Sequence, residues 1–270
     1  MTESAIDPGL LERGHVRLTV SGARATIVLD RPDRLNAQTP DTWKALREIG
    51  QNLADEVRVV DVRATGRAFS AGLDRRLFEA EEVDGSPGLL SLASRPVEQA
   101  DAEIAAFQQG FSWLRDPERV TIAAVRGHAI GAGFQLALAC DLRVVAEDAG
   151  FRMAETGLGL VPDLGGTLPL VQTVGYSRAV EMCLTGREVS AEEALRVGLA
   201  NSVVASEDLE AATDRLADAV VRAPRGAVRE TLALLSQASE AEDPEQQLAA
   251  ERAAQLRRLG ELSGTTPSEE

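Results

Sequence analysis

One stretch of the sequence, residues 120–146, restricts the fold more than any other. It contains, in order, an apolar strand over Val120–Val125, a glycine-rich turn over 127–133, a short apolar helix over 134–140 and a second strand over Leu142–Ala146. Apolar segments of strand length that alternate with helices are typical of α/β proteins. The turn leads into a helix start, where unpaired backbone N–H groups and the positive end of the helix dipole can receive negative charge. The stretch therefore predicts an α/β fold. The glycines of the turn have a second explanation, which is tight packing of the turn against the sheet.

The rest of the chain extends this pattern and then changes. Before residue 120 we expect strands over 16–20, 25–29 and 57–64, and helices over 39–53 and 97–114. Residues 78–95 are acidic and irregular, and we expect a lid or a mobile loop there. From residue 177 to 259 the pattern is helical, and the polar end of the chain is predicted to be disordered. We expect a core that holds any functional site over 1–200, a helical region suited to assembly over 201–260 and a tail over 261–270.

Composition excludes several classes of function. A formal net charge of −15 argues against a nucleic-acid partner, because phosphate contact needs a basic face. The two histidines, His15 and His128, and the single lysine, Lys44, leave few residues for a metal site, a Ser-His-Asp triad or a Schiff base. Cys140 and Cys183 cannot form a disulfide framework, and no apolar run approaches the roughly 20 residues that span a bilayer. We therefore expect a cytoplasmic protein that contacts no membrane and whose chemistry rests on carboxylates or backbone groups.

A second turn of small residues, over 67–74, also follows directly after a predicted strand. Two such turns at strand ends can each aim one backbone N–H at a shared carbonyl oxygen. That arrangement is an oxyanion hole, in which preorganised donors stabilise negative charge as it develops on an oxygen. The pair of turns therefore indicates chemistry more strongly than either turn alone.

Five segments, taken in order, are similar to a known family. They are 29–37 (LDRPDRLNA), 66–74 (GRAFSAGLD), 124–141 (AVRGHAIGAGFQLALACD), 157–167 (GLGLVPDLGGT) and 185–201 (TGREVSAEEALRVGLAN). Along nearly its whole length the sequence resembles the enoyl-CoA hydratase/isomerase (crotonase) superfamily. The resemblance implies a spiral of ββα units, a C-terminal helical trimerisation region, a homotrimer or dimer of trimers, and an acyl-CoA thioester as the substrate.

The resemblance also implies which residues form the site. In this family the thioester oxygen lies between two peptide N–H groups, which correspond here to those of Leu73 and Ala132. Loss of one such donor typically raises the reaction barrier by about 2.7–4 kcal/mol. CoA brings negative charge to an acidic protein, so nearby arginines are expected to offset the repulsion locally. The family segments place CoA-binding positions at Arg31, Arg34, Ala68 and Ala71.

The acid and base residues match the family unevenly. Related hydratases carry glutamates at the positions of both Gln135 and Glu155, and here only Glu155 is a glutamate. A glutamine cannot exchange a proton near neutral pH. Asp163 stands where several isomerases of the family have a catalytic aspartate. We therefore expect an enoyl-CoA isomerase in which Glu155 or Asp163 moves a proton between two carbons of a thioester enolate, without a metal or a redox cofactor.

Alternatives of other kinds stay open. Glu155 can instead carry hydration or dehydration of an enoyl-CoA while Gln135 positions the water. The absence of a second glutamate at Gln135 also suits a non-catalytic acyl-CoA-binding protein. A further alternative is an assembly subunit in which only the helices matter.

Overall fold

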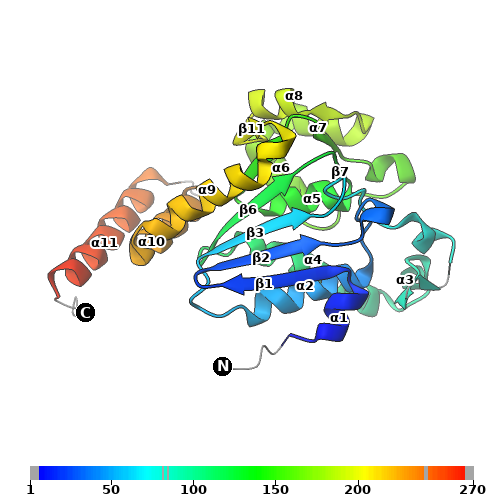
Figure 1. Ribbon diagram of the computed structural model, residues 1–270, viewed down its shortest axis with the longest axis horizontal. Helices are drawn as coiled ribbons and strands as arrows, with labels where there is room; N and C mark the ends of the chain where they lie inside the picture. The colour runs from blue at the N-terminus through cyan, green and yellow to red at the C-terminus, as the bar shows by residue number, and fades with distance from the viewer. Residues whose placement is uncertain (1–5, 81, 84, 240–242, 265–270) are drawn as a thin grey trace.

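The central sheet of the fold comes from the apolar segments of the first half of the chain. The structure, a computed structural model, describes residues 6–80, 82–83, 85–239 and 243–264. The sheet has the order β1-β2-β3-β6-β8-β11, with β1 antiparallel to β2 and every other pair parallel (Figure 1). Its strands are β1 (Val16–Ser21), β2 (Arg24–Leu29), β3 (Val59–Ala64), β6 (Val120–Val125), β8 (Leu142–Ala146) and β11 (Ser202–Val204).

Both faces of this sheet are covered, because successive side chains of a strand point to opposite sides. The covering helices are α2 (Pro40–Asn52) and α4 (Val97–Ser112) on one face and α9 (Leu209–Arg222) on the other (Figure 1). On β6, Ala123 and Val125 face the larger core, beside α2 and α4. Ile122 and Ala124 face the smaller core, beside α9. Burial on both sides explains why β6 is apolar at every position except Thr121.

A second, smaller sheet runs alongside the first and turns the chain into a spiral. Its strands, in the order β10-β9-β7, are β10 (Val189–Ser190), β9 (Gly150–Arg152) and β7 (His128–Ile130). Isolated bridges between Gln38 and Leu73 and between Ser70 and Ala129 continue the same kind of pairing in earlier parts of the chain. Strands β2, β3, β6 and β8 are each followed by an extended segment that pairs with the next turn of the chain. This repetition confirms the predicted spiral of ββα units.

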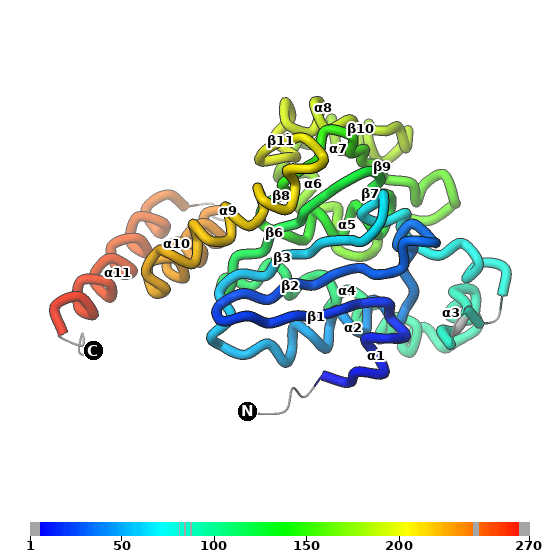
Figure 2. Tube along the Cα trace, in the orientation of Figure 1, coloured from blue at the N-terminus to red at the C-terminus, as the bar shows by residue number. Residues whose placement is uncertain are grey.

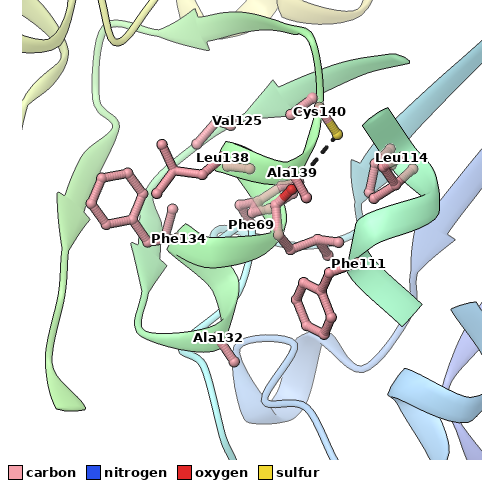
Figure 3. Packing of buried hydrophobic residues seen from close by; sticks show 14 of the residues in the cluster. Phe69, Phe111, Leu114, Val125, Ala132, Phe134, Leu138, Ala139 and Cys140 are labelled. Carbon is pink, nitrogen blue, oxygen red and sulfur yellow. Dashed lines mark hydrogen bonds between the residues drawn. The ribbon is translucent and has the colours of Figure 1, made fainter. Parts of the chain in front are cut away.

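The helix after the glycine-rich segment begins earlier than predicted. Helix α5 covers Ala132–Ala139, so it starts two residues before the predicted 134–140. Part of the predicted turn is strand β7, which pairs with β9, and that pairing is invisible to local periodicity. Every residue of α5 is buried, and Figure 3 shows side chains such as Phe69 and Phe111 packed around it.

The C-terminal part of the chain is not wholly helical as predicted. Strands β10 and β11 interrupt it, and β11 pairs with β8 at the edge of the large sheet. Helices α10 (Arg225–Ala238) and α11 (Pro244–Ser263) then lie side by side and project from the body of the protein (Figures 1 and 2). The tail predicted to be disordered over 261–270 is helical to Ser263, because Gly264 takes φ 70° and caps the helix end. Residues 265–270 lie outside the described residues.

Shorter elements connect these parts. Residues 78–95, predicted to be a lid or a loop, hold only short elements, and residues 81 and 84 lie outside the described ones. Within the described residues, no helix combines the length and the apolar character that crossing a membrane requires. The short strands and helices are α1 (Pro8–Arg13), β4 (Glu82–Val83), β5 (Ser86–Pro87), α3 (Leu90–Ala93), α6 (Thr167–Val174), α7 (Tyr176–Thr185) and α8 (Ala191–Arg196). The 3-10 helices are η1 (Pro32–Arg34), η2 (Arg75–Phe78), η3 (Trp113–Arg115), η4 (Glu155–Leu158) and η5 (Ser206–Asp208).

A buried carboxylate fixes α9 to the sheet. The side chain of Asp61, on β3, has 0% exposure and forms ion pairs with Arg24 and Arg63. These arginines also pair with Asp214 of α9, and Arg63 pairs in addition with Glu210 of α9. A buried carboxylate is stable only when it is paired and hydrogen-bonded. The cluster therefore joins three elements that are distant in the sequence.

Candidate active site

The start of α5 carries a backbone donor that has no partner in the described part of the chain. Gly131 precedes the helix with φ 51°, which favours glycine, and its own N–H donates to the Arg152 carbonyl at 2.8 Å. Ala132 is the first helical residue, and no acceptor within the described residues receives its N–H. The first N–H groups of a helix have no partner inside the helix, and they lie at its positive end. The Ala132 amide is therefore ready to bind an acceptor from outside the protein.

The turn over 67–74 carries the second such donor. Gly72 has φ 82°, its N–H donates to Ser70 Oγ at 3.1 Å, and its carbonyl accepts from the N–H of Gln38 at 2.7 Å. The N–H of Leu73, the next residue, donates to no acceptor in the part of the chain that the structure describes. A Cβ on Gly72 would lie 2.4 Å from the Ile130 carbonyl oxygen and 3.4 Å from the Ala132 nitrogen. The two turns are thus in direct contact, and glycine at 72 permits that contact.

Both donors open into one cavity of about 790 Å³. Helix α4 and the segment after η4 supply apolar side chains to its wall, and β9 and η4 supply polar ones. A larger cavity of about 1020 Å³ lies between α6, α9 and α10, but it contains neither donor nor Glu155. The lining of the smaller cavity includes Leu73, Ala132, Gln135, Glu155, Asp163, Arg34, Arg75, Arg76, Ala71, Trp43, Phe107 and Leu164.

Glu155 lies beside the donor at the start of α5. A Cβ on Gly131 would be 3.2 Å from Glu155 Oε1 and 3.8 Å from Oε2, so the carboxylate touches the turn that precedes Ala132. Oε1 accepts a hydrogen bond from Gln135 Nε2 at 2.7 Å. Oε2 is buried and has no hydrogen-bond partner within the described residues. Burial raises the pKa of Glu155, and the neighbouring Asp163 acts in the same direction.

Gln135 is held on three sides. Its Oε1 accepts from the backbone N–H groups of Leu164 and Gly166, at 2.9 and 3.2 Å, while its Nε2 donates to Glu155. The side chain therefore joins α5 to the segment that carries Asp163. A Cβ on Gly166 would lie 2.7 Å from Gln135 Cγ, so this contact is tight.

Asp163 lies on the wall of the cavity, where the surrounding protein changes its pKa. Its side chain lines the same cavity as Glu155, and burial raises its pKa. Its backbone carbonyl accepts from Gln108 Nε2 at 2.7 Å, which fixes the segment against α4. The structure therefore brings both candidate carboxylates to one cavity.

The four residues predicted to bind CoA are placed differently from one another. Arg34 and Ala71 line the cavity. Arg31 instead has a buried side chain paired with Asp74 at 2.9 Å, and it borders a shallow neighbouring hollow that also includes Arg34. Ala68 is fully buried and does not line the cavity.

Asp74 receives two arginines at the end of the turn that carries Leu73. Burial raises the pKa of Asp74, but hydrogen bonds from Arg76 and Arg31 outweigh this and lower it to about 2. Asp74 is therefore ionised near neutral pH. It holds the Arg76 guanidinium at the edge of the cavity and also pairs with Arg31, whose buried side chain does not line the cavity.

Two polar residues that position the turn over 67–74 were not found from the sequence. Gln38 donates through Nε2 to Ser70 Oγ at 3.1 Å, and its Oε1 accepts from Trp43 Nε1 at 2.8 Å. Asn36 donates through Nδ2 to the carbonyls of Thr65 and Ala68, each at 2.8 Å. Asn36 could have been found because it lies in the family-like segment 29–37. Gln38 lies one residue beyond that segment, so no such signal marked it.

The chain is similar to known proteins of one family. Residues 20–259 match the family model described as enoyl-CoA hydratase/isomerase. Structures of a "putative enoyl-CoA hydratase" from Thermobifida fusca YX, with CoA and with acetoacetyl-CoA, are 45% and 46% identical to this chain. They cover 98% and 95% of it, and 100% and 99% of their own chains, with TM-scores of 0.90 and 0.91. Carnitinyl-CoA dehydratase from Salmonella typhi is 38% identical over 76% of this chain and 74% of its own length.

The chain belongs to the enoyl-CoA hydratase/isomerase family. This confirms the resemblance that the five sequence segments indicated.

Proposed function

We propose that this protein adds water to an enoyl-CoA, or removes water from a 3-hydroxyacyl-CoA, with Glu155 as the acid and base. The observation that carries the proposal is the buried Glu155 carboxylate in one cavity with the amides of Leu73 and Ala132, neither of which has an acceptor among the described residues. The relatives described as a hydratase and a dehydratase support this class of reaction. Isomerisation, the reaction that the sequence favoured, becomes the second candidate.

The proposed reaction can be written with one carboxylate. In the dehydration direction, ionised Glu155 takes the proton from the carbon next to the thioester, and the electron pair forms an enolate. The Leu73 and Ala132 amides then stabilise the negative charge on the thioester oxygen. The enolate expels the 3-hydroxyl group, which leaves as water after Glu155 returns the proton to it. Glu155 ends ionised, as it began, and no electron is gained or lost, so the reaction needs no redox cofactor.

Binding of the CoA part is proposed at the arginine-rich edge of the cavity. A protein with a net charge of −15 repels the phosphates of CoA unless cations stand close to them. Arg34, Arg75 and Arg76 lie at that edge, and complexes of the Thermobifida relative with CoA and acetoacetyl-CoA support this kind of ligand.

The test compares the wild type with Glu155→Gln on a 2-enoyl-CoA and a 3-hydroxyacyl-CoA. We expect turnover in both directions, and a fall in kcat of about 10²–10⁴-fold in the variant, which is the usual contribution of a general acid or base. Glu188→Gln changes a glutamate that does not line the cavity and serves as the control. A protein that binds acyl-CoA without turning it over would instead be the non-catalytic binder.

Double-bond migration is a second candidate because Asp163 shares the cavity and affects the acidity of Glu155. Two carboxyl groups with different environments can remove a proton at one carbon and return it at another. The distinguishing experiment supplies a 3-enoyl-CoA and follows its conversion to the 2-enoyl isomer. If this conversion occurs in the wild type and is lost in Asp163→Asn while hydration persists, the second candidate is correct.

The assembly and location of the protein are also proposals. We propose a homotrimer or a dimer of trimers in the cytoplasm, with α10 and α11 in the contacts between subunits. Support comes from the projection of these helices and from Leu256 and Leu262 on α11, which are 64% and 79% exposed. Sedimentation equilibrium of the full chain tests this, and a monomer at micromolar concentration would contradict it.

A further inference from the structure

The hydrogen bonds of Gln135 suggest a role that the proposed reaction does not by itself require. Its amide is oriented without ambiguity, because the atom that meets the N–H groups of Leu164 and Gly166 must be the oxygen. The NH₂ group therefore faces Glu155. With two donors already on the amide oxygen, Gln135 has no lone pair left to accept a hydrogen bond from a catalytic water.

The two oxygens of Glu155 are consequently unequal. Oε1 receives the Gln135 amide and lies 3.2 Å from the position of a Cβ on Gly131. Oε2 is buried, unpartnered within the described residues, and belongs to a side chain that lines the substrate cavity. A buried carboxylate oxygen without a partner is costly unless a ligand or a proton occupies it.

We propose that Gln135 is a positioning residue that holds Oε1 of Glu155 and leaves Oε2 as the oxygen that exchanges protons with substrate. The inference rests on the proposed function for the identity of the substrate, but the hydrogen-bonded geometry stands apart from it. Because Gln135 also holds the Leu164 and Gly166 amides, it sets the carboxylate and the Asp163 segment relative to the start of α5. This role differs from the positioning of a water, which the sequence suggested for Gln135.

Other charged and titratable groups face Glu155 and can affect its pKa in any experiment that varies pH. Asp163 approaches from the segment after η4, Cys183 from α7, and Arg152 from β9 lines the same cavity. Burial and Glu155 itself raise the pKa of Cys183, so that thiol stays neutral at the pH values of interest. Burial raises the pKa of the Asp163 carboxyl as it does that of Glu155, and the variants below are therefore also made with Asp163→Asn.

The first variant, Gln135→Met, keeps the length of the side chain but removes its hydrogen bonds. A carboxylate that is free to turn loses its alignment with the substrate, and a displacement of about 1 Å can lower kcat by about 100-fold. We expect such a fall in kcat with a much smaller change in KM. Gln109→Met, an exposed change on α4, is the matched control and is expected to leave both unchanged.

The second variant, Gln135→Glu, tests the hydrogen bond itself. While protonated, the new carboxyl group can donate to Glu155 Oε1 as the amide does, but when both groups ionise they repel each other. The rate profile of the wild type is expected to rise with pH as Glu155 ionises and then to level off. In this variant we expect a bell-shaped profile with an additional fall on the basic side. In Gln135→Met, which adds no titrating group, we expect the single pKa of the profile to rise, which a merely structural role for Gln135 would not produce.

A measurement without turnover separates this inference from the proposed function. The pKa of Glu155 is followed by NMR of carbon-labelled glutamate in the wild type, in Gln135→Met and in Gln135→Glu. Because the bond from Gln135 favours the charged form, its loss is expected to raise the pKa of Glu155. An unchanged pKa together with an unchanged rate profile overturns the positioning role. If no acyl-CoA is turned over by the wild type, the proposed function fails, and the pKa shift alone decides the role of Gln135.

Discussion

Replacement of Gly72 by alanine would test whether contact between the two turns creates the site. At this position φ is 82°, and an alanine Cβ would lie 2.4 Å from the Ile130 carbonyl oxygen. The backbone cannot accept that overlap, so the turn over 67–74 must move away from the start of α5. The Leu73 amide moves with it, and the thioester oxygen loses one of its two proposed donors.

The expected magnitude has two parts. A left-handed conformation costs an alanine about 1–2 kcal/mol in folding free energy, whatever the space around it. Loss of one donor is expected to lower kcat by about 10²–10³-fold, which corresponds to a barrier higher by about 2.7–4 kcal/mol. Gly22 provides the matched control, since its φ is 56° but no atom lies within 4 Å of a Cβ there. Gly22→Ala should therefore show the cost in stability without the loss of rate.

The assay combines urea unfolding with steady-state hydration of a 2-enoyl-CoA. If Gly72→Ala keeps the kcat of the wild type and loses no more stability than Gly22→Ala, the two amides do not act together on one oxygen. If both variants lose kcat equally, the loss comes from general destabilisation, and the reasoning is again refuted. Only a rate loss confined to Gly72→Ala supports the geometry.

Three further predictions concern charge. Burial raises the pKa of Glu155, so the folded state loses stability as pH rises through that pKa. Glu155→Gln should therefore unfold at a higher urea concentration than the wild type at pH 7 but not at pH 4. Asp61→Asn should lower the free energy of unfolding by about 3–5 kcal/mol, because it leaves Arg24 and Arg63 without their buried partner. A loss below about 1 kcal/mol would show that this cluster does not hold α9 on the sheet. Arg34→Ala should raise KM for acyl-CoA by about two- to fivefold at low salt with kcat unchanged, since an exposed ion pair contributes at most about 1 kcal/mol, and a KM insensitive to salt in the wild type would contradict this.

Local patterns were sufficient for the elements that are buried on both faces or capped by a side chain. Strands β6 and β8 match their predicted limits, because each is a mainly apolar run that charged residues flank on both sides. Helix α2 begins after Thr39, close to the predicted start at 39, and the Thr39 side chain accepts from the N–H of Thr42. The α/β class and the spiral followed from such elements and from the family resemblance.

The elements that were misjudged depend on distant pairing. Strand β11 is only three residues long and exists because Ser202–Val204 pairs with β8, which no local signal reveals. The same holds for β7, hidden in a run of glycines and small residues. In the site, the Leu73 and Ala132 donors were implied by the family resemblance, and the two turns of small residues were the part that the sequence itself indicated. The contact between Gln135 and Glu155 could not be predicted, because two helical segments must fold together before it forms.

The spiral also bears on how such a site can diversify. The two proposed donors are backbone amides from separate turns of the spiral. Every residue except proline has such an amide, so their presence does not depend on side-chain identity. Apart from a change to proline, a single amino-acid replacement at Leu73 or Ala132 alters the side chain and leaves the amide in place. Substitutions can therefore change the walls of the cavity while the two amides proposed to bind the thioester oxygen are retained.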